Sequence, residues 1–595
     1  MPELQFKGKE FVYNHHLTVP FRPLEMLADK GIGASRLDGN LIIHGDNLHA
    51  LKALLPTHAG KVDCIFIDPP YNTGNEGWCY NDNVNSPMIK EWLSDNPIGL
   101  EDGLRHDKWA CMMWPRLKLL HELLADEGVI FIAIDSIELH TLKLICDEVF
   151  GLDNFIGEFI WKSRQNKDNR NESGQSNDHE FVLCYGGGLS GEIRSAADYK
   201  NRDNDPLGAW ASGNMVGLAS KDARPNLHYD LIDPVSRQNY GCPRRGWRFE
   251  PATMNKFISE GRIIWPEKST GRPRRKVYID ELSARTNVSS VFNIPVYTNT
   301  GSKTVRAIFG DDAFDFPKPY EIILHLLSLF ENQDITILDS FAGSGTTAHA
   351  VLAANARDGG NRRFILVEGE DYADTLTAER VRRVSKGYPF EGKMREELLR
   401  VPLTFSKLKH ANALLEQVQR IETLDGPKYD RIKPTVKDGV LIVTGERDVA
   451  ETAPGLGGDF TYCTLGAPIE MDAILSGAGL PDPAAMAGLL WHTATAQPFD
   501  PATMMPAPDI GEGVARLGDF AGRTYWLFYR DDLDWLKGGE AALSLSKARA
   551  IAATATGNHL VFAPAKFVSR ELLARERLDV DYAPLPFALY RLETA

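Results

Sequence analysis

Apolar residues recur along this chain in two alternating patterns. Short runs that are apolar throughout, in residues 41–44, 62–67 and 129–134, are typical of strands buried on both faces. Segments with apolar positions three and four residues apart, in 47–56 and 108–127, predict helices, the first of them ending at Pro56. Strands and helices that alternate in this way predict an α/β fold with a parallel sheet covered by helices on both faces.

The same alternation returns later in the chain. Residues 319–330 predict a helix, 335–339 a strand, 340–356 a glycine-rich turn into a helix, and 362–370 another strand. Before this, residues 180–187 predict a strand, and the segment that follows loses periodicity and is rich in Arg, Asn, Gly and Pro. We therefore predict an N-terminal extension (1–40), a core in two halves (41–190 and 301–400), an inserted loop-rich domain (191–300) and a C-terminal α+β region (401–595).

The charge of the chain is unevenly distributed. The formal net charge is −15, which by itself argues against a nucleic-acid-binding protein. Residues 191–300, however, carry 17 Lys and Arg against 12 Asp and Glu, whereas residues 401–595 carry 19 against 25. The predicted inserted domain is therefore a basic island in an acidic chain, and a polyanionic partner stays open.

The cysteines and the N-terminus bear on compartment. The seven cysteines are odd in number, scattered and never in a CxxC pair, which argues against a zinc ribbon, a metal site or a disulfide framework. The N-terminus has no apolar signal-peptide region, and no apolar run approaches the roughly 18 residues of a membrane span. A cytoplasmic, soluble protein without a membrane partner is expected.

A glycine-rich turn follows the strand at 335–339. The strand ends in Asp339, the turn contains Gly343-Ser344-Gly345, and a helix opens on Thr346. Glycines permit a tight turn, and the helix N-terminus offers N–H groups to an anion. The third glycine of the dinucleotide fingerprint is missing, so the turn fits a carboxylate better than a pyrophosphate. The missing glycine also argues against an NAD-dependent dehydrogenase.

Acidic and rigid residues end two further strands. Glu368 ends the strand after the glycine-rich turn, where a carboxylate can bind ribose hydroxyls. Asp68-Pro69-Pro70-Tyr71 ends the strand at 62–67. The carboxylate of Asp68 and the carbonyl of Pro69 can accept both hydrogens of an exocyclic amine, and Tyr71 can stack on a base. The alternative is a strand ended by prolines with a solvated aspartate.

The two motifs together resemble a known family. Asp68-Pro69-Pro70-Tyr71 followed by Phe341-Ala342-Gly343-Ser344-Gly345 resembles the S-adenosylmethionine-dependent DNA amino-methyltransferases, in the motif order of the β group. Residues 44–56, 61–82, 105–124, 128–135 and 316–327 look more specifically like modification subunits of type III restriction–modification systems. The resemblance spans about residues 40–390. It implies a Rossmann-like methyltransferase sheet with an inserted DNA-recognition domain and a separate C-terminal region.

The resemblance also implies roles for individual residues. The catalytic corner comprises Asp68, Pro69, Pro70 and Tyr71. Residues expected near the cofactor S-adenosylmethionine are Asp46, Lys318, Asp339, Phe341, Gly343, Ser344, Gly345, Thr346 and Glu368, with Asp339 at its ammonium, Lys318 at its carboxylate and Glu368 at its ribose. Two of these have a purely structural alternative, because Asp46 is placed to cap a helix and Lys318 can be a solvated lysine.

The inserted domain is expected to bind DNA. Its clustered basic residues lie beside Trp247 and Tyr278, and arginine suits both phosphate contacts and guanine readout. A solvated charged face is the alternative. The expected DNA-binding residues are Arg244, Arg245, Arg248, Arg272, Arg274, Arg275 and Lys276.

Taken together, the sequence predicts a DNA adenine-N6 methyltransferase that flips its target base out of duplex DNA. Within the same class the alternative is cytosine-N4 methylation, which the Asp at the first position of the DPPY motif disfavours by family tendency. An alternative of another class is a DNA-recognition subunit that serves a partner's restriction activity. The chain contains no GxxxxGK[ST] loop for ATP, so cleavage would need another polypeptide. Expected partners are double-stranded DNA, a second copy of the chain and a restriction (ATPase–nuclease) subunit.

Overall fold

The computed structural model describes residues 3–73, 103–167, 174–268, 270–403, 411–437, 440–469, 480–554 and 557–585. Segment 74–102, which contains part of the stretch 61–82, lies outside these residues. Contacts divide the chain into two compact units: unit 1 comprises Met1–Leu189 and Ser289–Ala595, and unit 2 comprises Ser190–Val288. Unit 2 is shorter at its C-terminal end than the predicted insertion 191–300, because helix α8 (Thr298–Phe309) belongs to unit 1.

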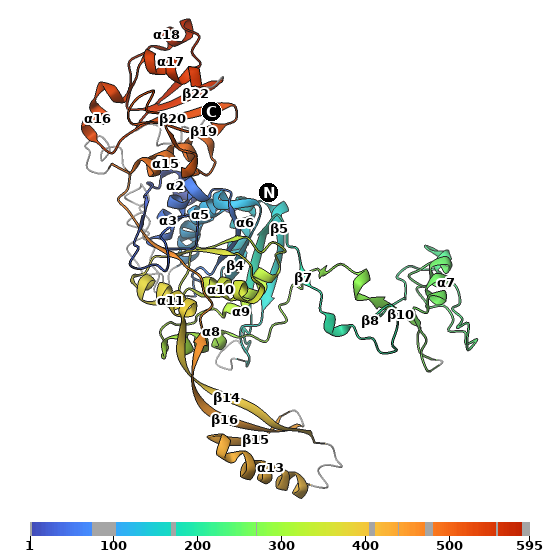
Figure 1. The fold of residues 1–595 in the computed structure, drawn as a ribbon. Helices are drawn as coiled ribbons and strands as arrows, with labels where there is room; N and C mark the ends of the chain where they lie inside the picture. The colour runs from blue at the N-terminus through green and yellow to red at the C-terminus, as the bar shows by residue number, and fades with distance from the viewer. Residues whose placement is uncertain are drawn as a thin grey trace. The chain divides into compact units, whose positions relative to one another are not determined.

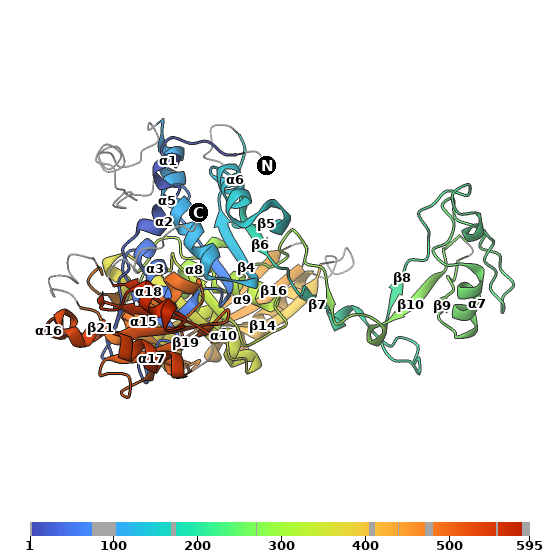
Figure 2. The same cartoon turned by 90° about the horizontal axis from the view of Figure 1, so that it is seen from above.

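A nine-stranded sheet forms the centre of unit 1 (Figures 1 and 2). Its central strands pair in parallel, as predicted, whereas both edges pair antiparallel, so the sheet is mixed. The strands in spatial order are β1 (Leu24–Met26), β17 (Thr461–Leu465), β2 (Leu41–His44), β13 (Arg363–Glu368), β12 (Thr336–Asp339), β3 (Val62–Ile67), β4 (Leu124–Ile134), β6 (Glu180–Gly186) and β5 (Phe155–Trp161).

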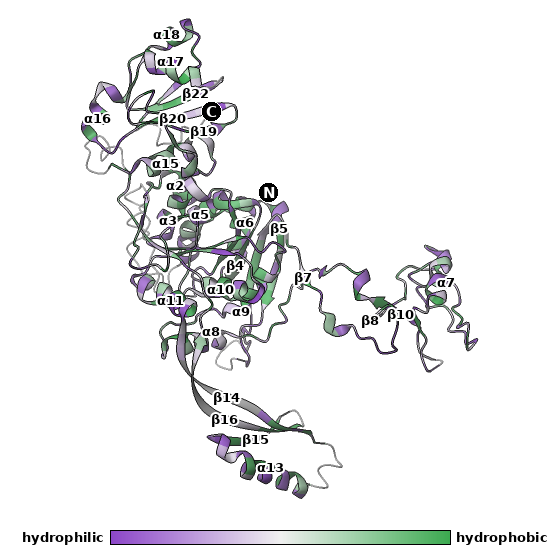
Figure 3. Cartoon of the chain, in the orientation of Figure 1, coloured by the Kyte–Doolittle hydropathy of each residue, from purple (hydrophilic) through white to green (hydrophobic). Residues whose placement is uncertain are grey.

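The apolar runs of the sequence are the buried strands of this sheet. Positions 41–43, 64–67 and 129–134 are all buried. The strands around β4 are accordingly hydrophobic in Figure 3. Strands buried on both faces need helices on both sides, which explains why the polar positions are confined to the helices and the strand ends.

Two groups of helices pack on the sheet. One group comprises α3 (Asn47–His58), α5 (Arg105–Leu123) and α6 (Leu139–Phe150); the other comprises α8, α9 (Tyr320–Ser328), α10 (Thr346–Asp358) and α11 (Glu379–Lys386). The prediction that the first helix ends at Pro56 was wrong, since α3 continues to His58. Pro56 lies in the last turn, where a missing N–H removes a single helical hydrogen bond. The N-terminal region adds α1 (Lys9–Val12) and α2 (His15–Thr18).

Residues beyond 400 do not all stand apart from the core, because β17 joins the central sheet beside β2. Among the described residues, no helix is long and apolar enough to cross a membrane. A three-stranded sheet begins just before residue 400 and comprises β14 (Gly387–Pro402), β16 (Val440–Pro454) and β15 (Arg431–Lys437), with α13 (Ala411–Asp425) in the same region. A five-stranded sheet follows, with β18 (Met505–Pro506), β19 (Val514–Phe520), β20 (Arg523–Phe528), β22 (Asn558–Ala563) and β24 (Val580–Pro584), and a short sheet pairs β21 (Ala542–Leu543) with β23 (Ala565–Lys566). The helices of this last part are α15 (Pro483–Thr495), α16 (Leu533–Lys537), α17 (Leu545–Thr554) and α18 (Arg570–Arg575).

Unit 2 has the loop-rich character that its sequence predicts. Its small sheet comprises β8 (Trp210–Gly213), β10 (Arg274–Tyr278) and β9 (Ile263–Ile264), and its longest helix is α7 (Pro251–Ser259). Its core is a cluster of buried apolar side chains: Met215, Leu231, Trp247, Met254 and Ile263. With so small a core, most of the unit's residues lie at its surface.

Candidate active site

The order of the strands brings the two sequence motifs together. Strands β2, β13, β12 and β3 are neighbours and run in parallel, so their carboxyl ends meet at one edge of the sheet. Asp68, Asp339 and Glu368 end β3, β12 and β13 or follow them directly, and Asp46 follows β2. Open α/β sheets bind ligands at this edge. The acidic positions predicted from sequence therefore lie around a single site.

The catalytic corner contains a partly buried network of charges. The ammonium Nζ of Lys318 lies 3.1 Å from Asp68 Oδ1 and 3.0 Å from Glu180 Oε2. It also donates to the hydroxyl of Tyr71 at 2.6 Å, and that hydroxyl in turn donates to Glu180 Oε2 at 3.0 Å. The network orients Tyr71 and places one cation between two carboxylates.

The protonation states of this network follow from burial and charge. Burial raises the pKa of Asp68, and the positive charge of Lys318 opposes that rise. Burial alone would lower the pKa of Lys318, but the charges of Asp68 and Glu180 raise it above its ordinary value, so the lysine stays protonated. Burial also raises the pKa of Tyr71, which keeps its hydroxyl proton. Lys318 is thus the group that favours an ionised Asp68.

One oxygen of the Asp68 carboxylate has unused capacity as an acceptor. Oδ1 is shielded from solvent, and the partner that the structure gives it is the ammonium of Lys318, 3.1 Å away, so a lone pair stays open to a further donor. A buried carboxylate oxygen is stabilised by each further donor that reaches it. An amine hydrogen would satisfy that oxygen, as the sequence interpretation requires.

Helix α5 and its neighbours hold the corner through contacts that the sequence interpretation missed. The indole N–H of Trp109 donates to the carbonyl of Pro70 at 2.7 Å. Asn72 adopts a left-handed φ of 60° directly after the motif, and its amide donates to the fully buried carboxylate of Glu138. His106 contacts the same carboxylate. Their spacing in the sequence does not identify these residues as parts of the site, because they reach the corner from separate elements.

The glycine-rich turn has the backbone geometry that glycine permits. Gly343 and Gly345 have φ of +49° and +77°, and Gly345 is the N-cap residue of α10, with no side chain capping the helix. A Cβ on Gly345 would lie 3.0 Å from the carbonyl oxygen of Thr377, too close for a comfortable contact. The first N–H groups of α10 therefore face the edge of the sheet without a competing cap, which suits an anion.

Two carboxylates flank this turn. Asp339 Oδ1 accepts from the backbone N–H of Phe341 at 3.0 Å, and burial raises the pKa of Asp339 to about 7. Glu368 Oε2 accepts from the N–H of Gly343 at 2.7 Å, and burial raises its pKa as well. These bonds fix both carboxylates against the turn and still leave lone pairs for further donors.

The remaining two predicted cofactor residues are placed as follows. Asp46 caps α3, accepting from the N–H groups of Leu48 and His49, so the helix-capping alternative is confirmed. Lys318 is not a solvated lysine, since its side chain lies in the catalytic corner while its backbone carbonyl lies 3.3 Å from the hydroxyl of Thr346 in the glycine-rich turn. Lys318 therefore links the two motifs.

The basic residues of unit 2 fall into two groups. Arg244, Arg245, Arg248 and Arg272 are exposed. The other three make internal contacts: Arg274 bonds to Ser212, Arg275 lies over the rings of Phe249 and Phe257, and Lys276 pairs with Asp203 and Asp205 at 2.5 Å. Arg274 is exposed as well, but its guanidinium is engaged by Ser212, so we keep only Arg244, Arg245, Arg248 and Arg272 as expected DNA contacts.

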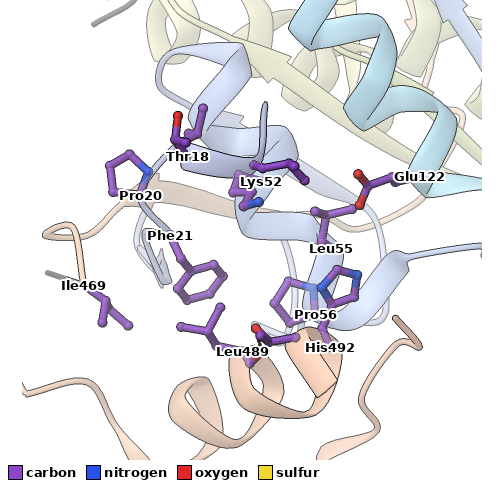
Figure 4. Close-up of a pocket in the computed structure, with 13 residues that line it drawn as sticks. Thr18, Pro20, Phe21, Lys52, Leu55, Pro56, Glu122, Ile469, Leu489 and His492 are labelled. Atoms are coloured by element: carbon purple, nitrogen blue, oxygen red, sulfur yellow. Dashed lines mark hydrogen bonds between the residues drawn. The ribbon is translucent and has the colours of Figure 1, made fainter. Parts of the chain in front are cut away.

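One pocket of unit 1 is lined by residues outside both motifs. It lies between α3 and α15 and is lined by apolar side chains such as Phe21, Leu55 and Leu489, with Lys52 and His492 at its margin (Figure 4). None of the DPPY or glycine-rich residues lines it. The pocket lies where the core meets the C-terminal region and is not part of the candidate active site.

Comparison with known proteins identifies the family. The family model described as "DNA methylase" (N6_N4_Mtase) matches residues 62–378, more than half of the chain and both motifs. This chain belongs to the DNA methylase family. The type II methyltransferase M.KpnI of Klebsiella pneumoniae is 34% identical to this DNA methylase over 346 residues, which cover 54% of this chain and 79% of M.KpnI.

Two longer relatives are modification subunits. The type III restriction–modification enzyme StyLTI Mod subunit of Salmonella typhimurium is 31% identical over 58% of this chain and 57% of its own length. The EcoP15I Mod subunit of Escherichia coli is 29% identical over 58% and 63%, respectively. The methylase thus spans less than two thirds of these relatives. Among solved structures, the M1.HpyAVI–SAM complex covers 57% of this chain at 14% identity with a TM-score of 0.27, so the fold assignment depends on the sheet itself.

Proposed function

We propose that this DNA methylase transfers a methyl group from S-adenosylmethionine to the N6 amine of adenine in duplex DNA. The observation that carries the proposal is the buried, incompletely bonded acceptor Asp68 Oδ1 at the same sheet edge as the uncapped N-terminus of α10. The first is suited to an exocyclic amine, and the second to the carboxylate of the methyl donor. The family tendency for motifs that begin with Asp favours adenine over cytosine.

The residues around the glycine-rich turn fit the methyl donor. The N-terminus of α10, with Gly345 and Thr346, would hold its carboxylate; Asp339 would hold its ammonium, and Glu368 its ribose. Both carboxylates are already fixed by backbone N–H groups, so little ordering is needed on binding. When bound, the cofactor supplies an activated methyl group on a positively charged sulfur.

The catalytic corner would act by position and charge. Asp68 and the carbonyl of Pro69 accept the two hydrogens of the amine and direct its lone pair toward the methyl carbon. The negative charge of Asp68 stabilises the positive charge that develops on the nitrogen as the methyl arrives, and it accepts the proton that the nitrogen loses. Tyr71, fixed by Lys318 and Glu180, provides a face for the flipped base.

The product base tests the proposal directly. Duplex DNA is incubated with the purified chain and S-adenosylmethionine, digested to nucleosides and analysed by mass spectrometry. We expect N6-methyladenine. Detection of N4-methylcytosine would mean that the same chemistry acts on cytosine. DNA that contains neither product would contradict the proposal. Sequencing of the methylated DNA then gives the recognition sequence.

Cofactor affinity should depend on pH through Asp339. Burial raises the pKa of this carboxyl to about 7, and an ammonium group is bound better by the ionised form. Protonation below that pKa removes the partner, so affinity for S-adenosylmethionine should rise from pH 6 to pH 8, with a proton released on binding near pH 7. Calorimetry in two buffers of different ionisation enthalpy measures both quantities. The Asp339→Asn variant should bind weakly and without this pH dependence; a flat wild-type profile would contradict the role.

The exposed arginines of unit 2 should supply DNA affinity. Replacing Arg244, Arg245, Arg248 and Arg272 by Ala should lower affinity by about 100-fold or more at moderate salt and reduce the slope of log affinity against log salt by up to about 4, because each phosphate contact contributes roughly 0.9. Lys256→Ala is the control, since this exposed lysine of the same unit is paired with Glu260. Fluorescence anisotropy at several salt concentrations measures the slope, and an unchanged slope would exclude these arginines.

A restriction–modification context is proposed from the names of the Mod-subunit relatives. In that setting a second copy of the chain and a restriction (ATPase–nuclease) subunit are the proposed protein partners. Light scattering of the purified chain, alone and with a co-expressed restriction subunit, tests them. A monomer that forms no complex would favour a methylase that acts alone.

A further inference from the structure

A fully buried arginine lies behind the glycine-rich turn and has no role in the function proposed above. Arg380, on α11, has no exposed surface. Its Nη1 donates to the hydroxyl of Ser344 at 2.8 Å and to the hydroxyl of Thr346 at 2.9 Å, and it lies 3.3 Å from the carbonyl of Ser344. Its Nη2 lies 3.2 Å from Nδ1 of His349. The guanidinium thus donates hydrogen bonds to two hydroxyls at the N-terminal end of α10, those of Ser344 and Thr346.

The charge of Arg380 is not neutralised nearby. Among the residues that the structure describes, none forms an ion pair with its guanidinium within 4.0 Å; Glu321 acts on it only from farther away. Burial lowers the pKa of Arg380 to about 10, which still leaves it a cation at neutral pH. Burial also lowers the pKa of His349, so that ring is neutral. A buried cation of this kind is unfavourable until an anion compensates it.

The hydrogen bonds of Arg380 also determine what the two hydroxyls can do. A hydroxyl has one proton and two lone pairs. Since Arg380 donates to the oxygens of Ser344 and Thr346, their protons must go elsewhere. The Thr346 hydroxyl donates to the carbonyl of Lys318 at 3.3 Å, and the hydroxyls of Ser344 and Thr346 are hydrogen-bonded to each other at 3.2 Å; both bonds are long, so an anion can compete for these protons. A donor polarised by a neighbouring cation makes stronger bonds to an anion than a neutral hydroxyl does.

The uncapped N-terminus of α10 adds to the same positive potential. Gly345 caps the helix without a side chain, so the partial positive charge of the helix and the charge of Arg380 act at one place. We propose that Arg380 is a positioning residue that supplies the counter-charge for the carboxylate of the cofactor, acting through Ser344 and Thr346. The inference rests on the proposed function, because it assumes that S-adenosylmethionine binds at this turn.

Two ligands that differ only in the carboxylate test this role. S-adenosylmethionine and its decarboxylated counterpart are titrated calorimetrically into the full-length chain and into three variants. Arg380→Met removes the charge, Arg380→Lys keeps it without the forked geometry, and Arg383→Met on the same helix is the control, since Arg383 contacts Glu379 and the carbonyl of Ile308. The ratio of the two affinities within each variant is the readout, because a general loss of folding would weaken both ligands alike.

We expect Arg380→Met to weaken S-adenosylmethionine about 10- to 100-fold, the range of a charged hydrogen bond, and to change the decarboxylated ligand by less than about threefold. Arg380→Lys should give an intermediate ratio and Arg383→Met the wild-type ratio. Equal losses for both ligands, or no loss, would overturn the inference. If Arg380→Met does not fold, the ratio in Arg380→Lys decides, and a wild-type ratio there would also overturn it. Wild-type protein that binds neither ligand would instead contradict the proposed function.

Discussion

Asp68→Ala is expected to abolish methyl transfer while cofactor affinity stays within a few-fold of wild type. The substitution removes the carboxylate that accepts the amine hydrogen and stabilises the charge on the nitrogen, and loss of one such preorganised group typically costs about 100- to 1,000-fold in rate. The cofactor residues lie on β12, β13 and α10 and keep their own contacts. Tritiated methyl transfer to DNA and calorimetric cofactor binding measure the two effects separately.

The matched control for this experiment is Asp126→Ala. Asp126 is an exposed aspartate near the amino end of β4, at the opposite edge of the same sheet. Its removal should leave transfer unchanged. Methyl transfer retained by Asp68→Ala would refute the assigned role, and loss of cofactor binding in that variant would mean that the corner serves the cofactor.

Lys318→Met should produce the second largest effect. It leaves the partly buried carboxylates of Asp68 and Glu180 close together without the cation between them, which is electrostatically unfavourable. Because Lys318 opposes the raised pKa of Asp68, its removal raises that pKa further and protonates more of the acceptor at neutral pH. Transfer at neutral pH should fall at least about 100-fold and recover in part as the pH is raised and Asp68 ionises again.

The comparison variants separate two roles for this lysine. Lys318→Arg keeps the charge and should retain more activity, with a pH profile close to wild type. Lys303→Met removes an exposed lysine of α8 and should have no effect. The role that the family resemblance implies for Lys318, at the cofactor carboxylate, would instead give a loss of cofactor affinity with no shift of the pH profile.

The local structure of the site was readable from short stretches of sequence. An apolar run that ends in Asp-Pro-Pro-Tyr, and a strand, glycine turn and helix over residues 335–356, are local signals because strand burial, left-handed glycines and free helix N–H groups depend on neighbouring residues. The same locality explains why the helix-capping alternative for Asp46 was available from sequence.

The contacts that shape the site were not readable in this way. Glu180 comes from β6, Trp109 from α5 and Arg380 from α11, and each reaches the motifs across a large separation in sequence. The antiparallel sheet edges and the addition of β17 to the core escaped prediction for the same reason. Strand pairing depends on which apolar surfaces find each other after collapse, and a single sequence carries little record of that choice.

The contacts of the basic residues of unit 2 were likewise not readable from the sequence. The sequence identified seven basic residues, but a side chain's charge does not tell whether it faces solvent. Lys276 pairs with two aspartates that lie some 70 residues earlier, and Arg275 covers two phenylalanine rings. Only the fold separated the cations that make such internal contacts from Arg244, Arg245, Arg248 and Arg272.

The sequence by itself determined the α/β class, the two motifs, their order and hence the kind of chemistry, because these reside in hydrophobic periodicity and in short runs of residues with special backbone or acid–base properties. The tertiary structure decided which strands are neighbours, and so that Asp68, Asp339 and Glu368 share one edge. It also decided the charge environment of that edge, with Lys318 between two carboxylates and Arg380 behind the glycine-rich turn. Electrostatic energy depends on distance and burial, and both exist only once the chain has folded.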